Sequence, residues 1–430
     1  MAIVEPVSLR FVLPELTGEV PSPPHDALSA AARRQHLIDH PRSYLGVTRS
    51  PEDIDPGSAD PAGDALRAGR RQLESMLQQG VFSPSSDSGF FIYRLELDGH
   101  RQTGLVCGVA TADYDDGTVR IHERINQGRA AHLANHLRVV GAQSSPIALA
   151  YKSRPAVADV IEAAIEANEA ILDFVDENGL RQRLWPIPEA SDIEKLRLSF
   201  ANAPLYLIDG HHRAAAASAD RADLAPHRQR HHLMLATLFP YEELRNQAFH
   251  RVLTGIDRAT FEAELVGRFP VRFTDDPEVV AGRAQTEVAF GVPRSPGMAP
   301  PLAGQEPAND GLDGPIRWLL VDVPFDIHAR SDLNNIDPVR LGNQILGPVL
   351  DIDEATSDPR LSYRPGWADA ESISAIAVGP DESVFLMRPV PMDVLMDASD
   401  EGLVMPPKST YFMPKVRSGL FLRVVDKSLG

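Results

Sequence analysis

The sequence is poor in cysteine, lysine and aromatic residues. Its single cysteine, Cys107, excludes a disulfide framework and cysteine-rich zinc or iron–sulfur sites. No apolar run approaches the roughly 20 residues of a membrane-spanning helix, and the first residues lack the charged and apolar regions of a signal peptide. We therefore expect a protein of the reducing cytoplasm without a membrane partner.

Acidic residues outnumber basic residues in this chain of 430 residues. Lys and Arg total 42, and Asp and Glu total 60, which leaves a net charge of -18. Such a chain repels nucleic acid, so bulk nucleic acid is not an expected partner. The apolar fraction of 43% is ordinary for a globular protein, and the length allows two or three domains. Neither the net charge, the apolar fraction nor the length excludes a homo-oligomer.

Local patterns predict an α+β fold. Residues 90–112 form two alternating segments around Asp98-Gly99, which predicts a β-hairpin. Residues 156–172 have the spacing of an amphipathic helix, whereas residues 275–315 are rich in Pro, Gly and Ala and predict a loop or insertion. Because strand and helix patterns stay mixed to the end of the chain, we expect mixed sheets with helices.

The most specific local pattern runs from Leu205 to Ala217, with the sequence LYLIDGHHRAAAA. An apolar strand ends in Asp209-Gly210 and a helix begins at once, and the free backbone N–H groups of such a helix start attract anions. Gly210 permits a close approach of the backbone, and Arg213 can bind phosphate or carboxylate oxygens. The pattern predicts a phosphate site, with a simple Asp209 N-cap beside surface histidines as the alternative.

A zinc site formed by four histidines is a less favoured interpretation of the same region. Adjacent histidines on a helix point in different directions, and the His-Glu pair at 122–123 lacks the second histidine of the metalloprotease pattern. The four residues are His211, His212, His231 and His232.

Three further side chains are candidates for catalysis. Glu123 could remove a proton from a substrate hydroxyl or bind Mg²⁺, and a surface ion pair is the alternative. His122 could act as a base or donate to a phosphate, or it could be a half-buried histidine with satisfied hydrogen bonds. Asp26 lies in a proline-rich turn, where it could orient a substrate or simply cap a helix.

A cationic segment near the C-terminus contains two of the five lysines of the chain. Lys408-Ser409-Thr410 follows two prolines, and Lys415 comes shortly after it. Lysine often binds phosphate as a point charge, but the Gly-x-x-x-x-Gly-Lys frame of a P-loop is absent. We interpret the segment as a second phosphate contact, with a rigid strand connection as the alternative.

Several segments of the chain together match one known family. In chain order they are VPSPPHDALS, HPRSYLGVTRSPEDID, GFFIYRLELDGHRQTGLVCGV, IHER, GAQSSPIALAY, LYLIDGHHRAAAA and MPPKSTYFMPKVRSGLF. With them the chain resembles the bacterial and archaeal family catalogued as domain of unknown function 1015. Its histidine–arginine motif is similar to the nucleotide-binding motif of the ParB/sulfiredoxin fold, which includes free-serine kinases, ParB-type CTP switches and sulfiredoxin.

The resemblance implies a domain organisation. Residues 1–255 are expected to form a ParB/sulfiredoxin-like nucleotide-binding region, and residues 256–430 a C-terminal α+β region that completes the site. The sequence departs from the family pattern after the His-Glu pair. Ile125, Ala130, Ala131, His132 and Leu133 stand where the family has Thr, two Glu, Asp and Arg. If those acids bind a metal or act as bases, this member has altered or lost that chemistry.

The resemblance further implies a kinase that transfers phosphate from ATP or ADP, with Mg²⁺, to a small hydroxylated metabolite such as a serine-like free amino acid. Two alternatives remain: a nucleotide-responsive regulatory protein without turnover, and an enzyme that uses the anion pocket for another phosphorylated or carboxylated substrate. The expected catalytic residues are Glu123, His122, Asp26 and Asp209, with Glu123 also as a metal ligand. The expected cofactor-binding residues are Gly210, His211, His212, Arg213, Lys408, Ser409, Thr410 and Lys415.

Overall fold

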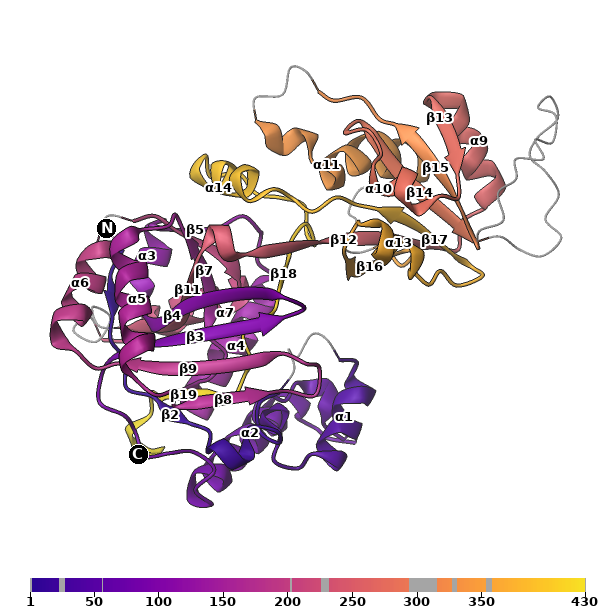
Figure 1. Cartoon of the computed structure of the whole chain (residues 1–430). Coiled ribbons are helices and arrows are strands. Elements are labelled where there is room, and N and C mark those ends of the chain that lie inside the picture. Colours follow the sequence, from indigo (N-terminus) through magenta and orange to yellow (C-terminus); the bar gives the residue numbers. More distant parts are fainter. Residues whose placement is uncertain are drawn as a thin grey trace. The chain divides into compact units, whose positions relative to one another are not determined.

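In the computed structural model the chain divides into two units (Figure 1). Unit 1 contains Met1–Leu244 and Pro414–Gly430, and unit 2 contains Arg245–Met413. The structure describes residues 2–22, 28–55, 57–201, 203–225, 232–293, 315–326, 331–352 and 358–429. None of the helices in these ranges combines the length and the apolar character needed to cross a membrane.

This division differs from the boundary expected at residue 255. Unit 2 begins with β12 (Arg245–Thr254), and the last residues of the chain return to unit 1. The return is made by β19 (Phe421–Val424), which pairs with β2 (Arg10–Phe11) and with β6 (Ala142–Gln143). Local sequence patterns do not encode this pairing, because the partner strands come from distant parts of the chain.

Unit 1 is built around a nine-stranded sheet with the order β5-β10-β7-β11-β4-β3-β9-β8, in which β1 pairs with β4. Its strands are β1 (Val4–Glu5), β3 (Phe90–Leu97), β4 (His100–Ala110), β5 (Val119–Arg120), β7 (Ile147–Tyr151), β8 (Leu172–Val175), β9 (Arg181–Ile187), β10 (Leu205–Asp209) and β11 (Leu233–Pro240). The pairs β5–β10 and β7–β11 are parallel, and the other neighbours are antiparallel. The mixed sheet with its helices confirms the α+β prediction.

The hairpin predicted around Asp98-Gly99 is present. Leu97 pairs with His100, so β3 and β4 are joined by the two residues between them. Asp98 and Gly99 both have positive φ, 50° and 72°. Two such residues match the right-handed twist of the flanking strands, which explains why an Asp-Gly pair favours this turn.

Helices pack against the sheet of unit 1 and against one another. They are α1 (Ala30–Asp39), α2 (Pro61–Gln78), α3 (Thr111–Asp115), α4 (Gln127–Val140), α5 (Pro155–Ala167), α6 (Ala190–Phe200) and α7 (His211–Ala222). α5 and α6 lie side by side and share a buried cluster with the strands (Figure 1), in which Val160 and Phe200 pack with Leu149 and Leu207. α4 packs along α7, the helix that begins at the proposed phosphate motif.

Two helix ends differ from the expectations. The N-cap of α1 is Ser29, whose hydroxyl accepts a hydrogen bond from the backbone N–H of Ala32 at 3.2 Å. Asp26, which the sequence suggested as a cap, lies outside the described residues. α5 ends at Ala167, because the remainder of the predicted helix 156–172 leads into β8.

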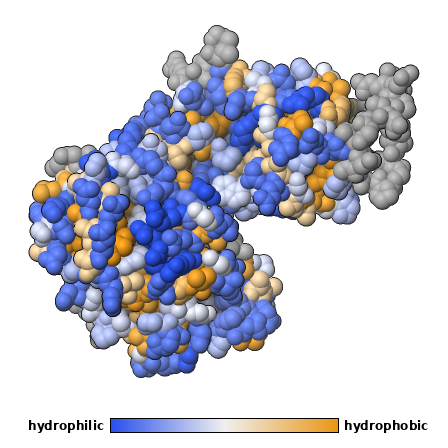
Figure 2. Space-filling view, in the orientation of Figure 1, coloured by the Kyte–Doolittle hydropathy of each residue, from blue (hydrophilic) through white to orange (hydrophobic). Residues whose placement is uncertain are grey.

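The sheet face on β3 and β9 carries hydrophilic side chains (Figure 2). The guanidinium carbons of Arg94 and Arg183 lie 5.5 and 5.2 Å from the ring centroid of Trp185. Arg183 also pairs with Glu96 at 2.8 Å. Arginine can cover an aromatic ring while its charge stays in water, so this part of the sheet meets solvent through guanidinium groups.

Unit 2 contains a seven-stranded sheet with the order β13-β15-β14-β17-β12-β16, in which β18 pairs with β12. Besides β12, its strands are β13 (Val271–Thr274), β14 (Glu287–Pro293), β15 (Ile316–Asp322), β16 (Leu361–Gly366), β17 (Glu382–Leu386) and β18 (Tyr411–Met413). Its α-helices are α9 (Arg258–Arg268), α10 (Pro277–Ala281), α11 (Asp337–Leu341), α12 (Gly347–Leu350), α13 (Ala370–Ser374) and α14 (Met392–Asp400). Val288 and Phe290 pack with α9 on one face, and Ala289 packs with α10 and α13 on the other.

The prediction of a loop over residues 275–315 is partly wrong. α10 and β14 occupy the first part of that range, whereas residues 294–314 lie outside the described residues. In β14 the alternation of Val288, Ala289 and Phe290 follows the period of a strand buried on both faces. The Pro and Gly content of the whole range concealed this short pattern.

A glycine substitution tests how closely the C-terminal segment Pro414–Gly430 packs against the rest of unit 1. Gly419 has φ 79°, and a Cβ there would lie 2.5 Å from Cβ and Cγ of the buried Tyr44. We expect Gly419→Ala to lower the free energy of unfolding by about 3 kcal/mol, from backbone strain and overpacking together. Gly99→Ala is the matched control, because φ is 72° and no atom lies within 4 Å of the added Cβ. It should lose about 1 kcal/mol. Urea unfolding of both full-length variants measures the difference, and equal losses would contradict the close fit.

Candidate functional site

The topology of unit 1 brings two motifs to one edge of the sheet. β5 and β10 are parallel neighbours, with Val119 opposite Leu205. The segments that follow their carboxyl ends therefore begin side by side, which places His122-Glu123 next to the chain at Asp209. β7 runs antiparallel to β10, so the residues before β7 reach the same edge.

Gly210 shapes the start of α7. It has φ 95°, and a Cβ there would lie 3.0 Å from Arg213 and from Ile147. The first helical hydrogen bond runs from the backbone N–H of Ala214 to the carbonyl of Gly210 at 2.9 Å. The N–H groups of the three preceding residues thus have no acceptor within the helix, which is the arrangement that binds anions.

The carboxylate of Asp209 links two cations. Lys415 and Arg213 both donate hydrogen bonds to it. Arg213 also donates to the backbone carbonyls of Ser145, at 2.9 Å, and of Pro146. The guanidinium that the sequence assigned to phosphate thus joins α7 to the start of β7.

The ionisation of Asp209 follows from these neighbours. Burial opposes the charge, but the ammonium of Lys415 and the guanidinium of Arg213 outweigh it and lower the pKa of this carboxyl to about 2. Asp209 is therefore ionised at neutral pH. A carboxylate with such a low pKa is a weak base, which argues against proton abstraction by Asp209.

His122, Glu123 and His211 form a cluster beside this ion pair. Within the described part of the chain, one ligand atom from each lies within 4.8 Å of the others. The two imidazole rings meet edge to face, with 4.6 Å between centroids. Both histidines are buried and Glu123 is half-buried.

Burial keeps both imidazoles of the cluster neutral. It lowers the pKa of His122 to about 4, against the opposing effect of a hydrogen bond to the backbone of Leu207. Burial and the adjacent ring of His122 lower the pKa of His211 well below its usual range. The rings are therefore hydrogen-bonding and ligating groups at neutral pH, and they do not supply positive charge to a phosphate.

His212 and His232 have separate contacts. Nε2 of His212 accepts a hydrogen bond from the backbone N–H of Asn126 at 3.0 Å, which ties α7 to the N-cap of α4. Both ring nitrogens of His232 are engaged, Nδ1 with Thr111 at 2.8 Å and Nε2 with Asp220 at 3.1 Å. These bonds argue against His232 as a zinc ligand, and His231 lies outside the described residues.

Lys408, Ser409 and Thr410 belong to unit 2, whereas Lys415 belongs to unit 1. Lys408 is exposed, has φ 58°, and its ammonium lies 5.2 Å from the ring centroid of Phe249. The hydroxyl of Ser409 donates to the carbonyl of Pro406 at 2.7 Å. These contacts form a turn that leads into β18, whereas Lys415 contacts Asp209 within unit 1.

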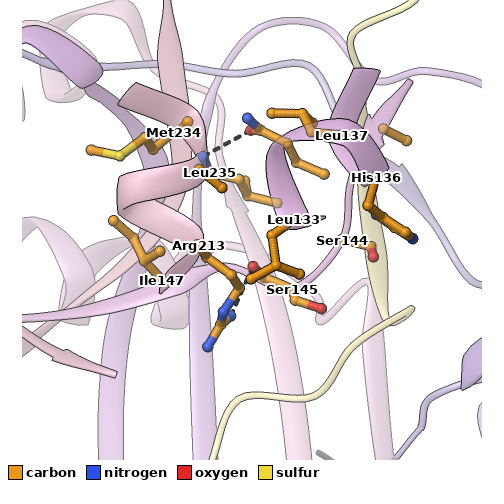
Figure 3. A pocket seen from close by; sticks show the side chains of 13 residues that line it. Leu133, His136, Leu137, Ser144, Ser145, Ile147, Arg213, Met234 and Leu235 are labelled. Carbon is orange, nitrogen blue, oxygen red and sulfur yellow. Dashed lines mark hydrogen bonds between the residues drawn. The ribbon is translucent and has the colours of Figure 1, made fainter. Parts of the chain in front are cut away.

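A small cavity lies between α4 and α7 (Figure 3). Its volume is about 110 Å³, and Leu133, Leu137 and Leu235 give it a largely apolar lining. Arg213 and Ser145 also line it. Pockets for drug-sized ligands occupy roughly 300–1,000 Å³, so this cavity is too small to hold a nucleotide.

The backbone groups that hold Arg213, His122 and His212 in place are the part of the site that the sequence did not reveal. Ser145, Pro146 and Leu207 contribute carbonyls to Arg213 and His122, and Asn126 contributes its N–H to His212. Carbonyl and N–H groups occur all along the backbone, so no residue type marks them. The pairing of β10 with β5 and β7 is the signal that would have found them.

The model of the family described as "Protein of unknown function (DUF1015)" matches residues 7–302, which is more than half of the chain. The chain belongs to this family. Both DUF1015 motifs at the sheet edge, the His-Glu pair and the segment from Asp209 to Arg213, lie inside the matched range. Lys415 lies beyond it. None of the curated proteins matches the chain.

Three solved structures are similar to this DUF1015 member at low identity. A free serine kinase in complex with AMP has 14% identity and a TM-score of 0.35, covering 74% of this chain and 92% of its own. SbnI with a C-terminal truncation, from Staphylococcus aureus, has 11% identity and a TM-score of 0.34, covering 73% and 87%. A conserved hypothetical protein from Pyrococcus furiosus has 13% identity and a TM-score of 0.33, covering 74% and 95%. TM-scores at this level carry no argument about the activity of this chain.

The ion pairs of Asp209 predict a pH dependence of stability. A pKa lowered from 3.8 to about 2 stabilises the fold above pH 4, and this contribution is lost as the pH falls from about 4 to 2. We expect Asp209→Asn to lower the free energy of unfolding at pH 7 by about 2 kcal/mol. Asp159→Asn, at an exposed position of α5, should change it little.

Urea unfolding at several pH values measures both variants against the unmodified protein. The deficit of Asp209→Asn should shrink toward pH 3, whereas a deficit that is absent at pH 7 or constant with pH would contradict the assigned ion pairs.

Proposed function

We propose that unit 1 binds the phosphates of a nucleotide at the start of α7. There it transfers a phosphoryl group from ATP or ADP to a small hydroxylated metabolite, with a serine-like free amino acid as the model acceptor. The observation that carries the proposal is the left-handed turn at Gly210. With it α7 begins at the edge of the sheet where Glu123 and Lys415 also lie, and the first N–H groups of a helix have no acceptor within that helix.

The charge of this region supports an anionic ligand. Lys415 and Arg213 contribute two positive charges and Asp209 contributes one negative charge, so the trio keeps one net positive charge at neutral pH. The neutral rings of His122 and His211 do not change this balance. Backbone N–H groups and a local positive charge together are a common way to bind phosphate.

Phosphoryl transfer depends mainly on positioning and charge neutralisation, so the site needs few reactive groups. Glu123 is the carboxylate that we assign to the acceptor hydroxyl. Asp209 is assigned to holding Lys415 and Arg213 in place, because its low pKa makes it a weak base. Asp26, the other carboxylate expected from the sequence, lies outside the described residues.

The cluster around Glu123 does not fit Mg²⁺ held by the protein alone. Mg²⁺ takes oxygen ligands in octahedral geometry and keeps several waters. Glu123 offers a carboxylate, but its neighbours in the cluster are two buried imidazoles. We therefore assign no resident Mg²⁺ to the chain.

A nucleotide-responsive protein without turnover is the second candidate. It is favoured by the contacts of Arg213, which connect the start of α7 to Asp209 and to the carbonyls before β7. A ligand at this helix start would alter groups that hold three segments of the chain. For either function we propose the cytoplasm, where the free thiol of the buried Cys107 would stay reduced.

Phosphorus NMR tests the proposal. The protein is incubated with ATP or ADP, Mg²⁺ in the buffer, and a pool of free amino acids and hydroxylated metabolites. We expect a new phosphoester resonance with the unmodified protein and with Gly99→Ala. Gly210→Ala should abolish the resonance and weaken nucleotide binding at least about tenfold, because the added Cβ disturbs the turn.

Calorimetric titration with nucleotide separates the two candidates. Binding without any product would favour the regulatory function. A protein that binds neither ATP nor ADP, or a Gly210→Ala variant that binds as tightly as Gly99→Ala, would contradict a phosphate site at α7.

A further inference from the structure

We propose that His122, Glu123 and His211 bind a divalent transition-metal ion, and that they do so without nucleotide. The proposal deepens the proposed function, because Glu123 belongs to both, but the ion site rests on observations of its own.

The first observation is the convergence of three potential ligands from two chain segments. His122 and Glu123 follow β5, and His211 is the first residue of α7. One ligand atom from each lies within 4.8 Å of the other two. Ligands about 2.1 Å from one ion lie roughly 3–4 Å apart, so small side-chain rotations would complete the site.

The second observation is the state of His211. The residue is 6% exposed, and its Nε2 has no hydrogen-bond partner among the described residues. Buried polar atoms in folded proteins are nearly always satisfied, and a bound water or ion is one explanation of an exception. A metal ion would supply the missing partner.

The third observation concerns the orientation of His122. Its ring hydrogen-bonds to the backbone of Leu207, which fixes the imidazole through one nitrogen. Metal-binding histidines commonly donate one ring N–H to a carbonyl in this way, so that the other nitrogen faces the ion.

The donor set selects the class of ion. Two imidazole nitrogens and one carboxylate suit Zn²⁺, Mn²⁺ and similar ions, whereas Mg²⁺ prefers oxygen ligands. Three protein ligands leave coordination positions for water or for an oxygen of a substrate. An ion at this position would add positive charge beside the start of α7 and would lower the pKa of a bound water or hydroxyl.

Titration of the full-length protein with a metal alone tests the proposal. After treatment with a chelator, the protein is titrated calorimetrically with Zn²⁺, Mn²⁺ and Mg²⁺ in the absence of nucleotide. We expect one strong Zn²⁺ site per chain, weaker binding of Mn²⁺ and the weakest binding of Mg²⁺. His211→Ala and Glu123→Gln should each weaken Zn²⁺ binding at least about tenfold.

A second, half-buried histidine pair provides the matched control. The rings of His36 and His40 on and after α1 lie 4.6 Å apart between centroids and could also attract Zn²⁺. His40→Gln removes this pair and should leave the strong site intact. If His40→Gln abolishes the binding and His211→Ala does not, the proposal is wrong.

The midpoint of thermal unfolding provides a second measurement of Zn²⁺ binding, independent of calorimetry. Zn²⁺ should raise the midpoint of the unmodified protein and of His40→Gln, and should raise it much less in Glu123→Gln, whose half-buried side chain keeps its shape. No Zn²⁺ or Mn²⁺ binding by the unmodified protein, or Mg²⁺ bound more tightly than both, would overturn the proposal. Because nucleotide is absent, these results leave the test of the kinase separate.

Discussion

The carboxylate of Asp209 holds the candidate site together. It accepts hydrogen bonds from Lys415, which lies on the returning C-terminal segment, and from Arg213, which also reaches the carbonyls of Ser145 and Pro146. One ionised side chain thus links the end of β10, the first turn of α7, the segment before β7 and the C-terminal segment. The two cations in turn keep the carboxylate ionised, since its pKa is about 2.

The groups of the site have separate roles. Lys415 and Arg213 are held by Asp209, while α7 begins at the turn of Gly210 with backbone N–H groups that have no acceptor within the helix. Beside them the buried imidazoles of His122 and His211 stay neutral. The parallel pairing of β5 with β10 explains why the start of α7 and the cluster of His122, Glu123 and His211 occur at the same edge of the sheet.

Local elements could be predicted from the sequence, and long-range assembly could not. The Asp98-Gly99 hairpin and the strand-to-helix junction at Gly210 follow from adjacent residues whose φ preferences are specific. Lys415 and Lys408 are close in sequence, yet they belong to different units, because β19 draws the end of the chain back to unit 1. The pairing of β19 with β2 and β6, which assigns Lys415 to unit 1, lies between segments that are distant in the sequence. Motifs of the family identify the residues that match them, but they do not show which strands pair.

A crystal structure of the protein with bound ADP is the most direct test of the central claim, that the start of α7 holds nucleotide phosphate. The account predicts phosphate oxygens about 2.7–3.2 Å from the backbone nitrogens of His211, His212 or Arg213. It also predicts that the ammonium of Lys415 lies close enough to the phosphate to form an ion pair with it. A phosphate bound elsewhere on the chain, with the start of α7 in contact only with water, would contradict it.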